Sequence, residues 1–354
     1  MIFCTIFSVE MILTQKNRLK VGKDETMVLQ KLSYHCARLY NVGLYSVRQH
    51  FFEEKKYLNY AQNFHACKDN ENYKLLLSDM AQPVLRIVER NMKSFFALLK
   101  LKKQKGYEQK VRLPRYKKKE AGWVIPIQGR SARVKNGKVI IGLSKAFKEE
   151  YKPKIKNLVF DLPRNIEAKK LQEVRILPQA LSHEFDIEYI YQKEITPHNL
   201  EPKKHLSIDL GLSNFACCFN STSGESFVID GRYIKAINQR YNKEIARHKS
   251  IKDQQGYKFT TKRMANLSKK RKWRLNDYFN RSVKTITDHC VAKNVGTLVI
   301  GDFQNIKQNI NIGKRNNQNF VQIPFEIFKR KLKSKCEQLG IIYQTAAQCS
   351  AYNL

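Results

Sequence analysis

The sequence predicts an α+β protein of several domains, and three observations lead to this class. The chain has 354 residues, which is enough for two or three domains with cores of their own. In the first half, apolar residues recur at helical spacing and are followed by short runs typical of strands. In the second half, three short strand-like runs precede long helical stretches and two further strand-like runs.

Net charge is the most unusual property of the composition. The chain holds 66 Lys and Arg against 31 Asp and Glu, a formal net charge of +35. A surface that only serves solubility normally mixes both signs. Each phosphate that a cation neutralises releases condensed counterions, so an excess of this size indicates a nucleic-acid partner.

The cysteines and the first residues of the chain indicate the cellular compartment. None of the eight cysteines forms a CxxC pair, so neither a zinc site nor a disulfide framework is indicated, and a reducing cytosol is favoured. The apolar start, residues 1–13, is short, contains Glu10 and has no basic n-region. We therefore expect a cytoplasmic protein without membrane association, whose true start is Met1 or Met11.

The first half reads as a small β-domain with a helical insertion. Residues 12–21 predict a strand, and Asp24 offers an N-cap to a helix that reaches about His50. Residues 68–73 read as a loop, and apolar positions from 85 to 99 mark another helix with Pro83 in its first turn. We expect the first strand or strands in 1–24, a helical domain in 25–104 and a β-domain in 105–192.

The β-domain is expected to be a small barrel that the strand at 12–21 completes. Asn136-Gly137 is a strong hairpin signal. Residues 193–204, with Pro197 and Pro202, read as a linker. The expected strands are 124–127, 133–134, 138–141, 158–160, 174–176 and 185–189.

Two basic stretches are the candidate nucleic-acid interface. Aromatic residues interleave with the first stretch, and bases can stack on aromatics while cations take phosphates. Such runs are also common on ordinary solvated surfaces. The candidates are Lys102, Lys103, Arg115, Tyr116, Lys117, Lys118 and Lys119, then Lys262, Arg263, Lys269, Lys270, Arg271, Lys272 and Arg274, and finally Lys314 and Arg315.

The second half, residues 205–354, is organised around the run 205–211. It reads as a buried strand that ends in Asp209, followed by a turn at Gly211. Runs at 214–219 and 227–229 complete a meander, helices are expected at 233–294 and 325–338, and strands at 297–302 and 341–343. RNase H-like nucleases begin their metal site with an aspartate on such a strand, where two or three carboxylates hold Mg²⁺.

Three stretches resemble TnpB, the transposon-encoded, RNA-guided DNA nuclease related to the type V CRISPR effectors. They are residues 207–212, 298–302 and 307–324, and the last is the most specific. Residues 80–96 and 113–117 also resemble recognition and wedge regions of that family. The resemblance covers nearly the whole chain. It implies a split β-barrel wedge domain, an inserted helical recognition domain, a truncated RuvC domain with an RNase H fold, and a guide RNA.

The acids that the resemblance requires for cleavage are incomplete in this sequence. Asp209 matches the first acid, but the position of the glutamate matches Gly301 or, in other members, the run containing Ala346 and Ala347. The family continues through a zinc-binding insert to a last aspartate, and this chain stops before both. A lone carboxylate cannot hold two Mg²⁺ ions, so we expect Asp209 to be vestigial, with no metal and no zinc ribbon.

Two other acids are weak substitutes for the missing ones. Asp302 follows Gly301 directly, so it is expected to face the opposite side of the strand. Glu337 lies on a predicted helix and is expected at the surface.

The closest resemblance is to nuclease-dead TnpB-like repressors. It implies a monomer that uses a guide RNA to occupy double-stranded DNA beside a short flanking motif and represses transcription on the bacterial nucleoid, without needing Mg²⁺ or another cofactor. By resemblance, Phe52 and Gln82 are candidates for the flanking-motif contact, since glutamine fits an adenine edge. The alternatives are an active or decayed TnpB-type RNA-guided endonuclease and a guide-independent nucleic-acid-binding protein. The guide, the target gene and the flanking motif stay open.

Overall fold

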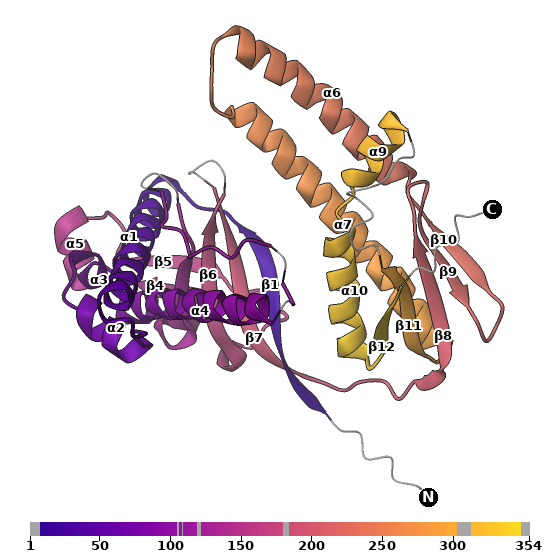
Figure 1. Cartoon of the computed structure of the whole chain (residues 1–354), viewed down its shortest axis with the longest axis horizontal. Coiled ribbons are helices and arrows are strands. Elements are labelled where there is room, and N and C mark those ends of the chain that lie inside the picture. Colours follow the sequence, from indigo (N-terminus) through magenta and orange to yellow (C-terminus); the bar gives the residue numbers. More distant parts are fainter. Residues whose placement is uncertain are drawn as a thin grey trace, which may run out of the picture. The chain divides into compact units, whose positions relative to one another are not determined.

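The computed structural model describes residues 8–104, 106–107, 109–118, 122–179, 184–302 and 313–347. The chain forms two compact units, an N-terminal unit of Ile12–Lys193 and a C-terminal unit of Glu194–Leu354, with which Met1–Met11 are grouped (Figure 1). Each unit mixes helices with strands, which confirms the predicted α+β multidomain class. In the described ranges, no helix is both long enough and apolar enough to cross a membrane.

Seven strands of the N-terminal unit form two sheets. One has the order β1-β7-β6-β2 and the other β3-β4-β5, so the first strand of the chain does join the later strands as expected. Between β3 and β4 the Lys135–Lys138 pair closes a hairpin over Asn136 and Gly137, whose φ angles are 50° and 69°. Both lie in the left-handed region that a type I′ turn requires, so the predicted hairpin is confirmed. The strands are β1 (Val9–Leu19), β2 (Ile125–Gln128), β3 (Ala132–Lys135), β4 (Lys138–Gly142), β5 (Asn157–Asp161), β6 (Leu171–Pro178) and β7 (Phe185–Ile195).

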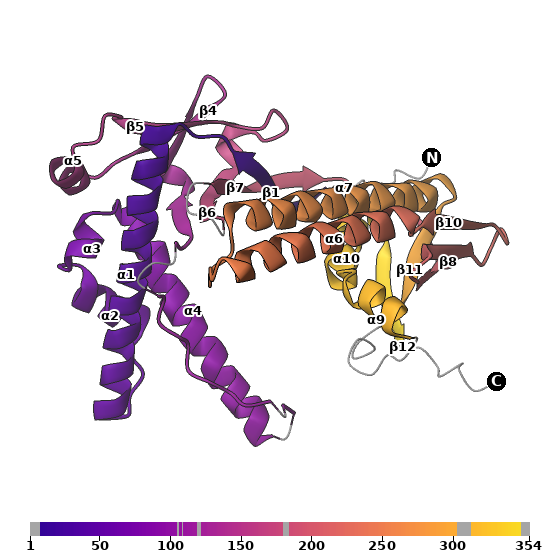
Figure 2. The same ribbon diagram turned by 90° about the horizontal axis from the view of Figure 1, so that it is seen from above.

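The helices of this unit share one core with its strands. Helices α1 and α4 pack together closely, and a Cβ at Gly43 would lie 2.7 Å from a methyl carbon of Leu85 (Figure 2). Buried residues of α1 and α4 belong to the same core as Ile127 of β2 and Ile176 of β6. The segment 25–104 thus has no core of its own. The helices are α1 (Lys23–Glu54), α2 (Tyr60–Cys67), α3 (Glu71–Lys74), α4 (Ser78–Lys103) and α5 (Lys145–Tyr151).

Helix boundaries in this unit differ from the sequence expectation at three places. Gly22 is the N-cap of α1, so Asp24 lies in the first turn, where its charge still favours the helix N-terminus. Helix α4 begins at Ser78, which puts Pro83 beyond the first turn. The expected loop at 68–73 contains the start of α3, which the Asn70 side chain caps by accepting from Asn72 N.

The expected linker at 193–204 is largely strand. β7 continues to Ile195 and β8 begins at Glu201. Pro202 is tolerated in β8 because the pairing of β8 with β11 is irregular between Val295 and Thr297. There the Thr297 hydroxyl donates to the Pro202 carbonyl oxygen over 2.7 Å.

A five-stranded mixed sheet forms the centre of the C-terminal unit. Its order is β10-β9-β8-β11-β12. β8, β9 and β10 are the predicted antiparallel meander, and β11 and β12 then run parallel to β8. These are the five strands that the sequence predicts for the second half of the chain. The strands are β8 (Glu201–Leu210), β9 (Asn214–Asn220), β10 (Ser226–Asp230), β11 (Val295–Asp302) and β12 (Ile342–Ala347).

Helices α7 and α10 cover one face of this sheet. The ring of Phe215 on β9 stacks on Phe279 of α7 at 5.4 Å and on Phe325 of α10 at 6.0 Å, and it meets Phe328 edge-on. Helix α6 and the first half of α7 extend beyond the sheet as an antiparallel pair, the α6–α7 hairpin (Figure 1). The helices are α6 (Arg232–Gln254), α7 (Lys262–Ala292), α9 (Lys314–Val321) and α10 (Phe325–Leu339).

Candidate functional site

β8 has two different faces, and Asp209 lies on the open one. Leu206, Ile208 and Leu210 are buried in the core of the unit, whereas Ser207 and Asp209 are exposed. The expectation of a buried strand therefore holds for one face only, because successive side chains of a strand point to opposite sides of the sheet. The carboxylate stands on the sheet surface opposite the phenylalanine core.

Neutral residues surround Asp209 across the sheet. Asp209 pairs with Cys217 of β9, which pairs with Val228 of β10. On the other side Ile300 of β11 pairs with Ile208, so the next residue, Gly301, lies level with Asp209. A shallow depression of about 540 Å³ covers this part of the face, and it is lined by Ser207, Ile208, Asp209, Cys217, Cys218, Phe219, Ser226, Phe227, Val228, Val299 and Gly301.

The positions where the family resemblance expects further acids are filled by other residues. Gly301 pairs with Ala346 of β12, and Ala347 follows at the next position. Three neighbouring strands thus bring Asp209, Gly301 and Ala346 to one level of the sheet with a single carboxylate among them. In the described ranges no three His, Cys, Asp or Glu side chains form a possible metal site. The residues at this level do not fit a pair of Mg²⁺ ions, which need several oxygen ligands.

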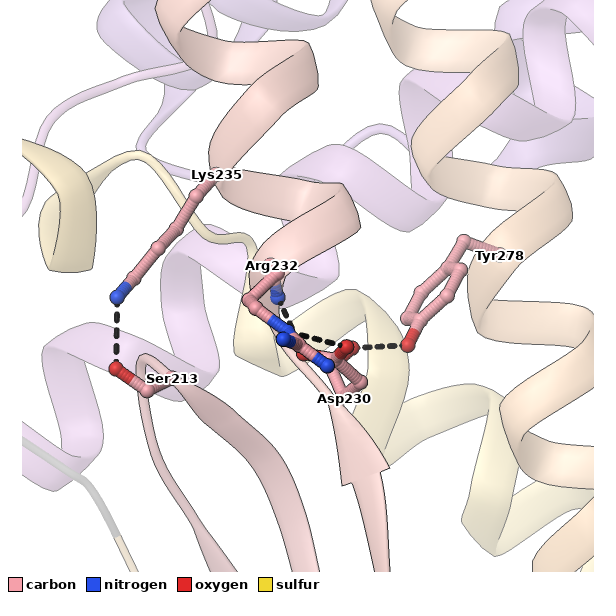
Figure 3. A network of polar contacts seen from close by, with 5 residues as sticks. All are labelled: Ser213, Asp230, Arg232, Lys235 and Tyr278. Carbon is pink, nitrogen blue, oxygen red and sulfur yellow. Dashed lines mark hydrogen bonds and ion pairs between the residues drawn. The ribbon is translucent and has the colours of Figure 1, made fainter.

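Asp230, the acid at the end of β10, is engaged by a neighbouring arginine. Its carboxylate accepts hydrogen bonds from Arg232 N at 2.8 Å and from Arg232 Nε at 2.7 Å (Figure 3). These bonds hold the pKa of the Asp230 carboxyl below its usual value. Glu337 is exposed on α10, as expected, and the side chain of Asp302 lies outside the described part of the chain.

The contacts in Figure 3 also fix the root of the α6–α7 hairpin to the sheet. The Tyr278 hydroxyl of α7 donates to the Asp230 carbonyl oxygen, and Lys235 Nζ of α6 donates to Ser213 Oγ over 2.7 Å. Gly231 N donates to the Ser213 carbonyl oxygen over 2.7 Å, and a Cβ at Gly231 would clash with the neighbouring backbone. Both helices are therefore tied to the end of the sheet where Asp209 lies.

Positive charge is concentrated on the outer part of the hairpin. From residue 247 to residue 274 the chain has eleven Lys and Arg and one acid, Asp253, which Lys252 engages at 2.6 Å. This part contributes almost nothing to the core, since the buried residues of α7 begin at Leu275. Of the predicted binding residues here, those exposed to solvent are Lys262, Arg263, Lys270, Lys272 and Arg274.

Arg271 makes several contacts within the fold, and its role as a nucleic-acid contact stays a prediction. Its Nε donates to Asn238 Oδ1 at 2.7 Å and its Nη2 donates to the Gln322 carbonyl oxygen at 2.8 Å. The guanidinium also lies over the Tyr241 ring, 5.0 Å from its centroid. Burial lowers the pKa of Arg271. Its donors thus join α6, α7 and the segment before α10.

Lys269 is partly exposed and also contacts a neighbouring aromatic ring. Its Nζ lies 5.1 Å from the centroid of the Trp273 ring on the same helix. Trp273 itself is exposed, so the pair lies at the surface of the hairpin. Both side chains face solvent in part and remain candidates for the interface.

Lys117 in the first basic stretch also makes several contacts within the fold, and its role as a nucleic-acid contact stays a prediction. Its Nζ lies over the rings of Tyr40 and Trp123, 4.7 and 5.3 Å from their centroids. Its backbone N donates to Asn41 Oδ1 at 2.7 Å, and its carbonyl oxygen accepts from Asn41 Nδ2 at 2.9 Å. Burial lowers the pKa of the Lys117 ammonium. These contacts hold the chain around Lys117 against α1.

Other members of this stretch face solvent. Tyr116 is exposed at the surface of α1, and the guanidinium of Arg48 lies 4.6 Å from the centroid of its ring. Lys102, Lys103, Arg115 and Lys118 are exposed. Lys119 and the side chains of Lys314 and Arg315 lie outside the described part of the chain.

Phe52 and Gln82 do not form one reading site. Phe52 is half-exposed near the end of α1, beside Phe51, whose ring contacts Phe96 of α4 at 5.6 Å. Gln82 is fourteen residues before Phe96 on α4, which is about 21 Å along the helix axis. A single base pair cannot contact both side chains.

The sequence analysis missed the outermost part of the hairpin. Tyr257 and Phe259, in the connection between α6 and α7, are 62% and 78% exposed, and Arg247 of α6 is exposed close to them in sequence. The signal was present, because two aromatics stand between lysines in a run without core periodicity. Because helices are expected over 233–294, the sequence does not single out these two residues as part of a connection.

Comparison with known proteins finds a family model that matches part of the chain and a structure with a similar fold. Residues 187–307 match the family model described as OrfB_IS605, probable transposase. The chain is similar to a structure titled a Cas12f1-sgRNA-target DNA complex, with a TM-score of 0.63 and 15% identity over 92% of this chain and 74% of that one. A CRISPR-Cas12f ternary complex matches at a TM-score of 0.36 and 14% identity, over 92% and 72%. No curated protein sequence matches the chain.

Proposed function

We propose that the chain is a TnpB-like protein, as its partial match to the OrfB_IS605 family model supports, and that it is an RNA-guided DNA-binding protein that does not cut its target. The guide RNA would select the target by base pairing, while the protein holds the RNA and the duplex through phosphate contacts. Occupancy of the target would then repress transcription. The fold similarity to a Cas12f1 protein in complex with sgRNA and target DNA supports the choice of partners.

One observation supports the part of the proposal that excludes cleavage. Asp209 shares its level of the sheet with Gly301 and Ala346, and Cys217 and Val228 continue the row. Cleavage by a two-metal mechanism needs carboxylates that offset the charge of both ions at the scissile phosphate. A lone carboxylate among neutral residues does not meet that need, so no step through Mg²⁺ is derived for this chain.

The exposed cations of the chain support nucleic-acid binding. Five of the predicted residues on the α6–α7 hairpin are exposed, and the one acid in residues 247–274, Asp253, is engaged by Lys252. Lys102, Lys103, Arg115 and Lys118 of the N-terminal unit offer a second exposed group. Binding of this kind requires neither Mg²⁺ nor zinc. We propose a monomeric ribonucleoprotein on the bacterial nucleoid, with Gln82 or Phe52, but not both at one base pair, near the flanking motif.

An active nuclease is the second candidate, and the exposure of Asp209 favours it. A vestigial acid on a sheet face could have been lost to a neutral residue without cost, yet this carboxylate still stands on the open face. That function would require acids brought to Asp209 from outside residues 8–302 and 313–347. A cleavage assay decides between the two.

The test of the proposal pairs two sequencing measurements on the expressed protein. RNA that copurifies with the chain is sequenced, and the genomic sites that the chain occupies are mapped in the same cells. The proposal predicts one RNA species of defined length and occupied sites that match its guide segment. Bound sites with no match to the RNA would support a guide-independent protein instead. No defined RNA would indicate a decayed transposase.

A further inference from the structure

We propose that the tip of the α6–α7 hairpin, residues 255–261, binds unpaired nucleotides by stacking their bases on Tyr257 and Phe259. The inference rests on the proposed function, because it assumes a nucleic-acid partner, and it specifies which form of nucleic acid this part of the molecule binds. It assigns single-stranded segments, rather than continuous duplex, to the end of the hairpin.

Exposure of the two rings is the first observation. At 78%, Phe259 has the largest exposed fraction among the large hydrophobic side chains of the described residues, and Tyr257 reaches 62%. Neither ring makes an aromatic contact that would explain its position as packing. Two aromatic side chains so far from any core are typical of a binding surface rather than of a fold requirement.

The backbone of the tip holds these rings in a defined place. Gly256 has a φ of +66°, and its N donates to the Asp253 carbonyl oxygen at 3.0 Å. Tyr257 N donates to the Lys252 carbonyl oxygen, and Lys252 Nζ returns a bond of 2.6 Å to the Tyr257 carbonyl oxygen. These bonds hold the start of the turn against the end of α6, and a turn held in this way loses less conformational entropy on binding than a free loop does.

A cationic pocket lies directly behind the tip. It occupies about 360 Å³ between α6 and α7 and is lined by Glu244, Arg247, His248, Arg263, Asn266, Leu267 and Lys270. Three cations on two helices thus face one cavity, and the one acid in its lining lies 4.0 Å from His248. Arg263 is only four residues from Phe259, so phosphates can contact the pocket while bases reach the rings.

Charge and ring exposure together select the class of partner. Residues 247–274 carry eleven Lys and Arg against one acid, which favours a polyanion over another protein surface. In a blunt duplex the faces of the bases are already stacked on one another, so aromatic rings have nothing to stack on. Unpaired nucleotides expose those faces, and aromatics within a basic groove are how proteins bind them.

The experiment measures affinity against salt concentration for the full-length chain. The probes are a fluorescent twelve-nucleotide RNA without secondary structure and a blunt duplex of the same length. For Tyr257→Ala/Phe259→Ala we expect single-strand binding weaker by on the order of tenfold or more, with an unchanged slope of log affinity against log salt. Duplex binding should stay as in the unchanged protein. Tyr233→Ala, an exposed aromatic at the root of the same hairpin, is the matched control and should change neither.

Phe259→Trp supplies a second readout that does not depend on loss of binding. Its emission should be quenched by the single strand and not by the duplex. Equal losses on both probes, or no loss and no quenching on the single strand, would overturn the inference. If occupied genomic sites still match a copurified RNA, that result leaves the proposed function standing. If the unchanged protein binds neither probe, the proposed function fails first and this inference with it.

Discussion

The open sheet face and the α6–α7 hairpin belong to the same unit but have opposite chemistry. On the sheet face one carboxylate stands among Cys217, Val228, Gly301 and Ala346. On the hairpin, exposed cations are dense, and Asp253, the one acid in residues 247–274, is engaged by Lys252. In the proposed function, cleavage would depend on the first region and nucleic-acid binding on the second. A chain can therefore lose one activity and keep the other, provided that the core between them persists.

The largest effect should come from breaking that shared core. Phe215→Ala removes the ring that contacts Phe279, Phe325 and Phe328, and we expect a loss of about 3–5 kcal/mol in the free energy of unfolding. Denaturant unfolding measures it. Phe219→Ala, on the open face and 49% exposed, is the matched control and should change stability by about 0.5 kcal/mol or less. Equal losses would contradict the division into a packed and an open face.

A smaller but clear effect should separate two adjacent cations of the hairpin. Arg271→Ala removes bonds to Asn238 and to the Gln322 carbonyl oxygen, so we expect a loss of about 1–3 kcal/mol in unfolding free energy. Lys272→Ala removes an exposed side chain and should leave stability within about 0.5 kcal/mol. Thermal unfolding of both variants is the measurement. Comparable stability of the two would show that Arg271 is not a structural tie.

Salt dependence should distinguish contacting cations from structural ones. For the single-stranded RNA probe, each of Lys262→Gln, Arg263→Gln and Lys270→Gln should reduce the slope of log affinity against log salt by about 0.7 if that side chain meets a phosphate. Lys117→Gln should leave the slope unchanged, since its ammonium lies over Tyr40 and Trp123. A slope that also falls for Lys117→Gln would return this residue to the interface.

The sequence predicts more of the fold than of the candidate site. The Asn136-Gly137 turn and the meander that begins with the Asp209 strand follow from local chemistry, and the structure has them. Whether Lys117 or Arg271 faces a phosphate or an aromatic ring depends on neighbours far away in sequence, such as Trp123 or Gln322. A run of basic residues in the sequence does not show which of these side chains contacts a distant part of the fold. The same holds for the expected linker at 193–204, where pairing with β11 overrides the prolines.

The smallest effect is expected at Asp209. Asp209→Asn keeps the shape of an exposed side chain on the open face, so affinity for guide-matched DNA and stability should both stay within the error of measurement. A gel-shift titration and an unfolding curve provide the two numbers. A marked loss of binding would indicate that the sheet face takes part in the interface, and the contrast between the two regions would then be wrong.

The most direct test of the account loads the purified chain with a guide RNA and adds one labelled, matched duplex in Mg²⁺. Binding and cleavage are followed in the same reaction, with Asp209→Ala and a mismatched guide as controls. The account predicts a retained duplex that stays intact, equally for the unchanged protein and for Asp209→Ala. Strand breaks that appear with the matched guide and disappear in Asp209→Ala would contradict it.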